Sequence, residues 1–374
     1  MAWWDDQPKN GDQPTRTPVF EVINLSPRWR ARLRIKRLLA ERWLDALGPP
    51  RSWRRGPSFV GLCYHAVIAD DDRTSWYDPN LVTSVAFLRR QLSLLRRWFE
   101  PVLSTALIER LGLLPGEIPM ALVTFDDGLR SVHDFGLGVM REHDIKATMF
   151  LNDSVIGGEG GLWHDSAAGS ARLLTRDTVS RILAECGHPR GRAALSIIDD
   201  TLARRTVEAL KEMAAPSLTC AVEALVTTSG YTPSRRRYLS AQEARSMFDA
   251  GHELGGHSTH HFILPLLDKV ALLREISGNR EALEAMFERP VSVFAYPNGD
   301  HGARERDALR DLGFAGAFEV EGDGSGGLWA LPRRNACDLM CMDEKGQFSA
   351  ALYFWTLLSP RRWIRRLGRA ARRV

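Results

Sequence analysis

The sequence predicts an α/β fold in which parallel strands form a sheet or a closed barrel. From residue 58 onward, short apolar runs of β type alternate with amphipathic helical runs, and three of the predicted strands end in polar, chemically active residues. Repeated strand–helix units form parallel sheets or barrels, with active sites at the carboxyl ends of the strands. The chain has 374 residues, 44% hydrophobic and 26% charged. This globular composition excludes wholesale disorder, a collagen-like repeat and a disulfide scaffold.

Residues 1–57 are predicted to form a basic arm and an amphipathic helix. They contain 12 basic and 6 acidic residues, and the helical pattern runs from Ser26 to Leu47. The Ser26-Pro27 pair is a typical N-cap followed by a first-turn proline, and a Gly-Pro-Pro run ends the helix. This helix either lies on a membrane surface or packs against the body of the protein, and the sequence favours neither.

Residues 58–340 are predicted to form the barrel. The strands are residues 59–67, 120–125, 146–152, 252–258, 291–299, 313–320 and 328–336. The helices between them are residues 85–99, 133–142, 240–250, 270–287 and 304–312. Ser240 and Glu243 form a capping-box pattern. Residues 153–238 have few β signals and helical runs at 172–186, 203–214 and 218–228, so we expect a helical insertion there.

Residues 341–374 are predicted to form a basic, amphipathic C-terminal tail. The last 14 residues contain seven arginines and no acidic residue. Such a segment either binds anionic lipid or is simply solvated. We expect peripheral membrane contact through the basic ends and no nucleic-acid partner, because no nucleic-acid-binding module accompanies the charge.

The cysteines and the N-terminal residues bear on the location of the protein. The five cysteines (Cys63, Cys186, Cys220, Cys337 and Cys341) are scattered and contain no CxxC pair, so we expect reduced thiols. The first 18 residues contain no apolar stretch typical of a secretory signal. These features predict a cytoplasmic protein.

The first polar strand end is the run TFDDG, in which Asp126 and Asp127 are adjacent. Neighbouring carboxylates at the end of a strand point to different sides, so one can bind a cation while the other stays free as a base. The following Gly128 allows the backbone to turn sharply.

The second and third strand ends contain histidines and a rigid turn. His257 and His261 are four residues apart, and on a helical turn both imidazoles would share one face and could bind one metal ion. Two histidines and one carboxylate leave positions open for water and substrate, as in catalytic metal sites. In the run FAYPNG, proline and glycine fix a turn whose backbone N–H groups could face an oxyanion.

The runs TFDDG, HSTHH and FAYPNG resemble, in order, the first three motifs of the NodB-homology polysaccharide deacetylases (carbohydrate esterase family four). The resemblance spans residues 59–337, with 153–238 as a poorly matching insert. It implies a distorted (β/α) barrel. It also implies that Asp126 is the catalytic base and that Asp127, His257 and His261 bind a divalent metal, expected to be Zn²⁺.

Two departures from the family pattern concern the other catalytic residues. The usual third motif begins with an arginine that orients the base, and this chain lacks it, although the backbone N–H of Asn298 can still donate to an oxyanion. The late histidine motif that usually supplies the general acid is also not visible, since the last histidine is His301. The early Tyr-His pair instead resembles the circularly permuted subgroup that includes deacetylases of biofilm poly-N-acetylglucosamine, which implies that His65 is the general acid. Our candidate for the missing arginine is Arg333, with Arg334 as the alternative.

The predicted function is removal of N-acetyl groups from an N-acetylated saccharide or glycolipid in surface polysaccharide metabolism. Two alternatives stay open. One is an amidohydrolase of the same fold that acts on a formyl group or a cyclic amide. The other is an inactive carbohydrate-binding or membrane-surface protein, which the altered third motif favours. For Trp163 and His164 we weigh an aromatic sugar platform against core packing, and expect packing.

Overall fold

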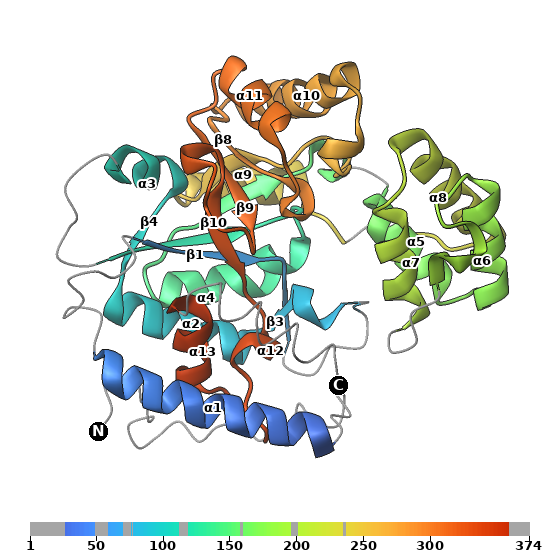
Figure 1. The fold of residues 1–374 in the computed structure, drawn as a ribbon. Coiled ribbons are helices and arrows are strands. Elements are labelled where there is room, and N and C mark those ends of the chain that lie inside the picture. Colours follow the sequence, from blue (N-terminus) through green and yellow to red (C-terminus); the bar gives the residue numbers. More distant parts are fainter. Residues whose placement is uncertain are drawn as a thin grey trace.

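Seven parallel strands form a closed barrel at the centre of the protein (Figure 1). The computed structural model describes residues 27–48, 59–69, 76, 78–111, 119–157, 160–195, 201–234 and 237–358. The barrel strands are β1 (Phe59–Tyr64), β5 (Met120–Phe125), β6 (Thr148–Leu151), β7 (Glu253–Gly256), β8 (Val293–Ala295), β9 (Gly316–Val320) and β10 (Leu331–Asn335). They follow the order β1-β10-β9-β8-β7-β6-β5, and β5 pairs with β1 to close the ring. The predicted parallel barrel is confirmed.

Strand β5 is enclosed on both edges and both faces. All six of its residues are buried. One edge pairs with the whole of β1, and the other is divided between a short strand, β4 (Glu100–Val102), and β6. Strands buried on both faces are nearly continuous apolar runs, and in MALVTF only Thr124 is polar. The two carboxylates that follow β5 therefore lie at a buried end of the barrel.

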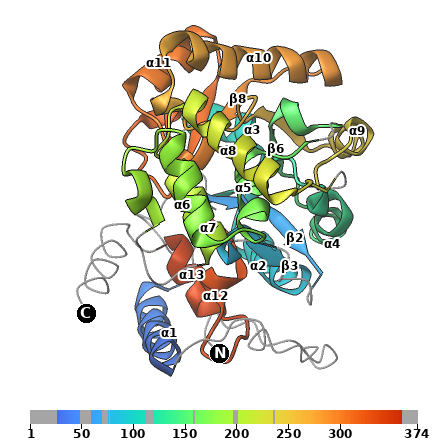
Figure 2. The same ribbon diagram turned by 90° about the vertical axis from the view of Figure 1, so that its right-hand side faces the viewer.

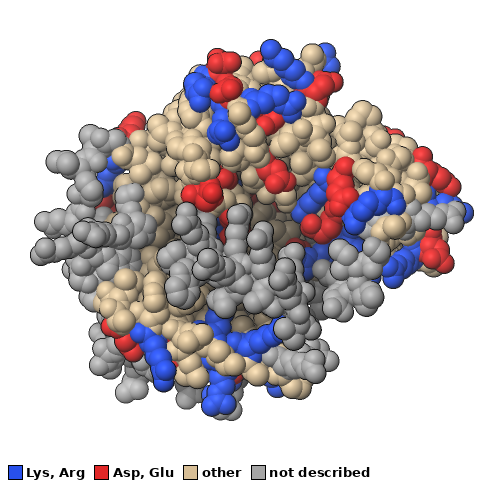
Figure 3. Space-filling view, in the orientation of Figure 1, with Lys and Arg blue, Asp and Glu red and all other residues tan. Residues whose placement is uncertain are grey.

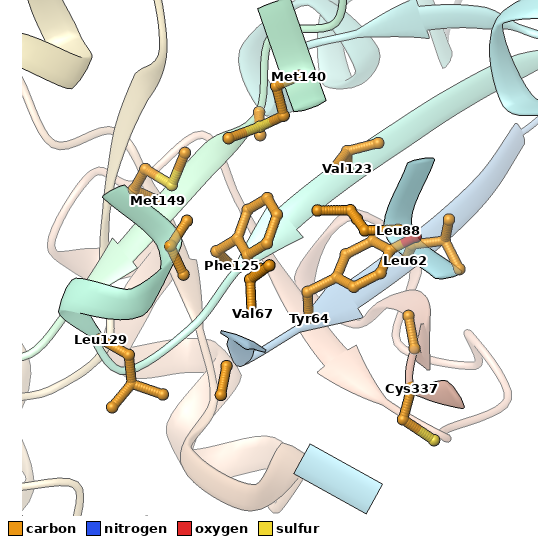
Figure 4. Packing of buried hydrophobic residues seen from close by; sticks show 14 of the residues in the cluster. Leu62, Tyr64, Val67, Leu88, Val123, Phe125, Leu129, Met140, Met149 and Cys337 are labelled. Atoms are coloured by element: carbon orange, nitrogen blue, oxygen red, sulfur yellow. The ribbon is translucent and has the colours of Figure 1, made fainter. Parts of the chain in front are cut away.

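The predicted strand at residues 59–67 is interrupted at His65. After β1, residues Ala66–Ile68 form β2, which pairs with β3 (Val82–Ser84) in a separate two-stranded sheet. Figure 4 shows Tyr64 and Phe125 close together, and their rings stack with centroids 5.2 Å apart. The chain thus leaves the barrel at His65, and this histidine lies at the carboxyl end of β1.

Helices surround the barrel (Figures 1 and 2). They are α2 (Val85–Trp98), α3 (Ser104–Leu111), α4 (Leu137–Glu142), α9 (Ala241–Asp249), α10 (Lys269–Phe287) and α11 (Ala303–Asp311). The predicted helices agree with α2, α9, α10 and α11 to within about two residues. A π-helical turn, Val132–Gly136, precedes α4. The predicted capping box of Ser240 and Glu243 is present.

The helical insertion packs around an apolar cluster of its own. Its described helices are α5 (Trp163–Ala171), α6 (Arg176–Glu185), α7 (Leu202–Leu210) and α8 (Ala215–Ser229). They lie at one side of the barrel (Figure 1). The sequence does not predict α5, because its run WHDSAAGSA is buried nearly all round and so lacks an amphipathic pattern.

One expectation about the cysteines is wrong. Cys186, which ends α6, and Cys220, in α8, form a disulfide. They are 34 residues apart in the chain, and only the packing of α6 on α8 brings them together. Cys63, Cys337 and Cys341 are free and buried.

The segment predicted to begin the C-terminal tail belongs partly to the body. Residues 341–358 include the end of α12 (Asp338–Cys341) and all of α13 (Ala350–Leu358). Leu352, Tyr353 and Phe354 in α13 are fully buried. This apolar run packs against neighbouring helices and cannot be a solvated tail. The basic residues 361–374 and the arm at residues 1–25 lie outside the described residues.

Helix α1 (Pro27–Leu47) packs against α13. Its buried face contains Leu33, Ala40 and Leu44, and the ring of Trp43 meets that of Trp355 edge to face with centroids 5.2 Å apart. Of the two interpretations of this helix, packing on the body is therefore observed. Within the described part of the chain, no helix combines the length and apolarity needed to cross a membrane.

Candidate active site

The polar residues singled out from the sequence gather at the carboxyl ends of the barrel strands. Asp126 and Asp127 follow β5, His65 follows β1 and His257 follows β7. Arg333 reaches Asp126 from within β10. Parallel strands end on the same side of a barrel, which explains how four strands contribute to one group.

Asp126 is held by Arg333. Nη1 of the arginine donates to Oδ1 at 2.6 Å and Nη2 donates to Oδ2 at 2.8 Å, and both side chains are buried. Burial alone would raise the pKa of Asp126, but the Arg333 guanidinium outweighs it, so the pKa lies below its ordinary value. The carboxylate is therefore ionised at neutral pH and fixed in orientation.

Neighbouring residues support this pair. Nη1 of Arg333 also donates to Oγ1 of Thr124 at 2.7 Å, and Sγ of Cys63 donates to Oδ2 of Asp126 at 3.2 Å. Gly61 on β1 lets β10 approach closely, since a Cβ there would lie 2.7 Å from a backbone oxygen of β10 and 3.2 Å from Cγ of Arg333. Sequence patterns do not reveal the role of these three residues, because Cys63 and Gly61 meet Asp126 and Arg333 only in the folded barrel, and Thr124, although it opens the run TFDDG, has no role in the motif.

The structure distinguishes the two arginines of the run LPRRN. Successive residues of a strand point to opposite faces. Arg333 points into the barrel towards Asp126, whereas Nη1 of Arg334 pairs with Oε2 of Glu321 at 3.3 Å. The first candidate for the base-orienting arginine thus contacts the predicted base, and the alternative points elsewhere.

Asp127 faces two histidines. Its Oδ1 lies 3.4 Å from Nε2 of His257 and 3.4 Å from Nε2 of His261. The backbone of Asp127 is left-handed (φ 73°), as is that of Gly128 (φ 71°), which gives the sharp turn expected beside the carboxylates. Burial would raise the pKa of Asp127, but the facing His257 and His261 rings outweigh it, so the pKa lies well below its ordinary value.

This group fits a divalent metal. Oδ1 of Asp127 is buried, and no group in the described residues makes a hydrogen bond to it. Nδ1 of His257 lies 2.7 Å from the carbonyl oxygen of Ala295, which orients the ring with Nε2 towards Asp127. One carboxylate oxygen and two imidazole nitrogens, with no hydrogen bond to that oxygen, form a ligand set that Zn²⁺ and related ions prefer.

Residues 257–261 do not form the helical turn expected from the sequence. They form a loop after β7 in which Ser258 (φ 61°) and His261 (φ 59°) have left-handed backbone. The side-chain amide of Asn152 donates to the carbonyl oxygens of His257 and Ser258, and that of Asn279 donates to Ser258 at 3.0 Å. The two histidines face the same carboxylate because these buried asparagines hold the loop. Neither asparagine stands in a motif, so the sequence does not reveal them.

His65 lies beside the carboxylates. A ring nitrogen of His65, the sulfur of Cys63 and an oxygen of Asp126 all lie within 4.8 Å of one another. Burial lowers the pKa of His65, and the attraction of Asp127 and Asp126 offsets this only in part. A protonated ring at this position is therefore a stronger acid than an exposed histidine.

Asn298 lies in the tight turn after β8. Its backbone is left-handed (φ 58°), and its exposed side chain donates to Oδ2 of Asp300 at 2.6 Å. Gly299 is required next to it, because a Cβ there would lie 2.8 Å from backbone atoms of Val320. The rigid turn expected from the sequence is present, and the role of the Asn298 N–H towards an oxyanion stays a prediction.

The structure adds one histidine for which packing is the role expected from the sequence. His164 in α5 has a ring nitrogen within 4.8 Å of ligand atoms of Asp127 and His261. Its ring meets that of His261 with centroids 5.0 Å apart and planes at 70°. In the sequence, His164 stands between Trp163 and Asp165, ahead of a run of small residues, which is no signal for a metal ligand.

Comparisons with known proteins agree with this arrangement. The family model described as polysaccharide deacetylase matches residues 115–317, more than half of the chain. This range contains the predicted base Asp126 and the three predicted metal ligands, and it ends before β10. A comparison with curated proteins finds no match.

Solved structures of deacetylases resemble this chain. The Streptococcus pyogenes deacetylase PplD, in complex with acetate, aligns with a TM-score of 0.50 at 15% identity, over 81% of this chain and 98% of its own. A de-N-acetylase from Aggregatibacter actinomycetemcomitans has a TM-score of 0.48 at 13% identity, over 78% and 97%. IcaB from Ammonifex degensii aligns with a TM-score of 0.43 at 18% identity, over 71% of this chain and 84% of its own. The likeness to PplD shows the fold alone, and the family match adds the activity class. The chain belongs to the NodB-homology polysaccharide deacetylase family and is a carbohydrate deacetylase.

Proposed function

We propose that this chain is a metal-dependent enzyme that removes N-acetyl groups from an N-acetylated saccharide or glycolipid in surface polysaccharide metabolism, such as exopolysaccharide biosynthesis. The observation that carries the proposal is the different surroundings of two adjacent carboxylates. Asp126 is paired with Arg333, whereas Asp127 lies between two imidazoles. Hydrolysis of an amide with the help of a metal needs one carboxylate in each of these states.

Asp127, His257 and His261 would hold the metal, for which we propose Zn²⁺. A bound ion of this kind lowers the pKa of a water from about 15.7 towards about 7 and polarises the amide carbonyl.

Asp126 is proposed to accept the proton of the attacking water. Each carboxylate oxygen can accept two hydrogen bonds. Among the described contacts, Oδ2 accepts from Arg333 and Cys63, and Oδ1 accepts from Arg333. Oδ1 thus has an acceptor position left for water, and Arg333 keeps the carboxylate in one orientation throughout.

His65 is proposed to protonate the leaving amine. An amine anion is a very poor leaving group, and a positioned acid of this kind contributes about 10²–10⁴-fold to the rate. The backbone N–H of Asn298 is proposed to stabilise the oxyanion, a contribution of about 3–4 kcal/mol in other enzymes. The products are acetate and an amino sugar.

The geometry around Asp126 argues against the inactive alternative. That alternative depends on the arginine missing from the third motif. The guanidinium of Arg333 makes two hydrogen bonds to Asp126 from another strand, so the chain has an arginine on its predicted base. A protein that only binds carbohydrate needs no such pair beside a group of metal ligands.

The test combines metal content with acetate release from N-acetylglucosamine oligomers on the same samples. We expect one divalent metal per chain in the wild type and its loss, together with acetate release, in His257→Ala. Asp126→Asn should keep the metal and lower kcat/KM for acetate release by about 10²–10⁴-fold.

The outcomes separate the alternatives. Metal without acetate release would move the search to lipid-linked sugars and to a panel of formyl and cyclic-imide substrates. Absence of metal after reconstitution with Zn²⁺ would contradict the proposal.

We further propose a cytoplasmic location and peripheral membrane contact, and the outer face of α1 supports the membrane contact. Ile35 (59% exposed), Leu38 (46%) and Leu39 (51%) lie on this face. The basic residues Arg32, Arg34 and Arg42 are exposed on the same helix. Figure 3 shows basic side chains among uncharged ones at the lower edge of the molecule, where α1 lies. Apolar residues flanked by arginines are typical of helices that bind anionic lipid.

Sedimentation with vesicles tests the membrane contact. The wild type should bind phosphatidylglycerol vesicles and not phosphatidylcholine vesicles, and Ile35→Asp/Leu39→Asp should bind at least about tenfold less. Leu173→Asp, at an equally exposed leucine of the insertion (62%), is the matched control. Equal binding by all three proteins would contradict a role for α1. Cell fractionation tests the location, and finding the chain in the periplasm would contradict it. This test is needed because disulfides form mainly in oxidising compartments, and the structure contains one.

A further inference from the structure

We propose that His164, supplied by the helical insertion, is a fourth protein ligand of the metal centre. The inference rests on the metal dependence proposed above and goes beyond the three ligands expected from the family motifs. It is carried by the position of one ring nitrogen of His164, within 4.8 Å of both Asp127 and His261.

The orientation of His164 fits this role. Its Nδ1 faces Oδ1 of Asp165 at 3.7 Å, which leaves Nε2 as the nitrogen for a metal. A metal-binding histidine commonly directs its other ring nitrogen at a carboxylate or a carbonyl oxygen, and this partner fixes the ring. His257 follows the same rule through the carbonyl oxygen of Ala295.

Asp165 is itself held in place by two residues at the C-terminal end of the insertion. Nη2 of Arg237 donates to Oδ1 of Asp165 at 2.6 Å, and Nε of Arg237 and the hydroxyl of Tyr238 donate to Oδ2. The carboxylate behind His164 is therefore fixed in position by three hydrogen bonds.

A further contact joins the start of α5 to the loop at residues 257–261, which contains two predicted metal ligands. Nε1 of Trp163 donates to the carbonyl oxygen of His261 at 2.8 Å. Trp163 and His164 therefore touch the same ligand residue, one through its backbone and the other through its ring. This is the geometry expected if the insertion and the barrel share one site.

A fourth protein ligand is compatible with catalysis. Zinc sites can become five-coordinate, and other divalent ions accept six ligands. Three histidines and one carboxylate would then leave at least one position for water or the carbonyl oxygen of the substrate.

The test measures metal affinity, which does not depend on activity. Purified wild type, His164→Ala and His164→Asn are titrated with Zn²⁺ in competition with a chromophoric chelator, and their Co²⁺ absorption spectra are compared. The control is His188→Gln, because His188 is buried in the same insertion and hydrogen-bonds to Ala209 and Arg190.

Both His164 variants should bind Zn²⁺ at least about 10–100-fold more weakly, with a changed Co²⁺ spectrum, because even outer-shell partners of metal ligands have effects of this size. His188→Gln should stay within about threefold of the wild type. Unchanged affinity and spectrum in the His164 variants would overturn the fourth ligand. Equal losses in the control would also overturn it, because the fold of the insertion would then explain the effect. A wild type that binds neither ion would instead overturn the metal dependence itself.

Discussion

The barrel and the helical insertion bury different kinds of side chain. The barrel encloses ionised groups, including the fully buried Arg333 and its partner Asp126. The insertion encloses an apolar cluster, and Asp165 is the buried carboxylate among its described residues. Asp165 lies beside His164, at the corner of the insertion that meets the barrel. Among the described residues, the insertion buries a carboxylate only where it meets the barrel, and the rest of the insertion is a packed apolar unit.

The comparison predicts first that the barrel is sensitive to the loss of a buried charge. Arg333→Met should lower the free energy of unfolding by about 3–5 kcal/mol, because it leaves Asp126 buried without its partner. Arg334→Met is the matched control one residue away, and its partner Glu321 is half exposed, so we expect a loss below about 1 kcal/mol. Denaturant unfolding measures both values. Equal losses of unfolding free energy in the two variants would contradict the prediction that the buried pair stabilises the barrel more than the exposed pair does.

The second prediction concerns the insertion alone. Cys186→Ser/Cys220→Ser removes a cross-link that closes a loop of 34 residues, which should destabilise the insertion by about 3 kcal/mol. Hydrogen exchange should become faster in α6 and α8 and stay unchanged in β5 and β1. The reduced wild-type protein should behave like the double variant. Faster exchange throughout the barrel would show that the two regions are one cooperative unit.

The third and smallest effect is a pH dependence in the barrel. His252 is buried before β7 and accepts a hydrogen bond from the N–H of Ala147, and burial, followed by the charge of Lys146, lowers its pKa to about 4. The unfolded chain binds the proton near pH 6.5, so folding stability is complete above that pH and is lost as the pH falls towards 4. We expect a loss of about 2 kcal/mol between pH 7 and pH 4.5. His252→Gln should lack this component of the pH dependence, and identical slopes in both proteins would contradict the assignment.

The sequence predicts the fold and the residues that gather at the site, but it does not predict the backbone that holds the two histidines. The alternation of strands and helices predicted the barrel, because each strand is a short apolar run. The motifs follow predicted strands, and parallel strands end on the same side of a barrel. The sequence therefore predicts that Asp126, Asp127 and His257 lie together at the carboxyl ends of the strands. The four-residue spacing of the histidines predicts a helical turn, whereas the backbone there is a loop, because the sequence does not show that Asn152 and Asn279 hold it.

Contacts between distant segments explain the remaining differences. The Cys186–Cys220 disulfide and the approach of His164 to Asp127 both depend on how the helices of the insertion pack. The same is true of α13, whose burial against α1 changes a predicted tail into part of the core. None of these pairings leaves a periodic signal along the chain.

The pairing of Asp126 with Arg333 also has a consequence for how the protein is made. The two residues are 207 positions apart, and Arg333 lies in the strand that joins β9 to β1 and completes the ring. A nascent chain that has not yet released β10 from the ribosome has an unpaired edge on β1 and a carboxylate without its guanidinium. The same step of synthesis therefore closes the ring and gives the predicted base its partner, so a chain truncated before residue 331 would have neither.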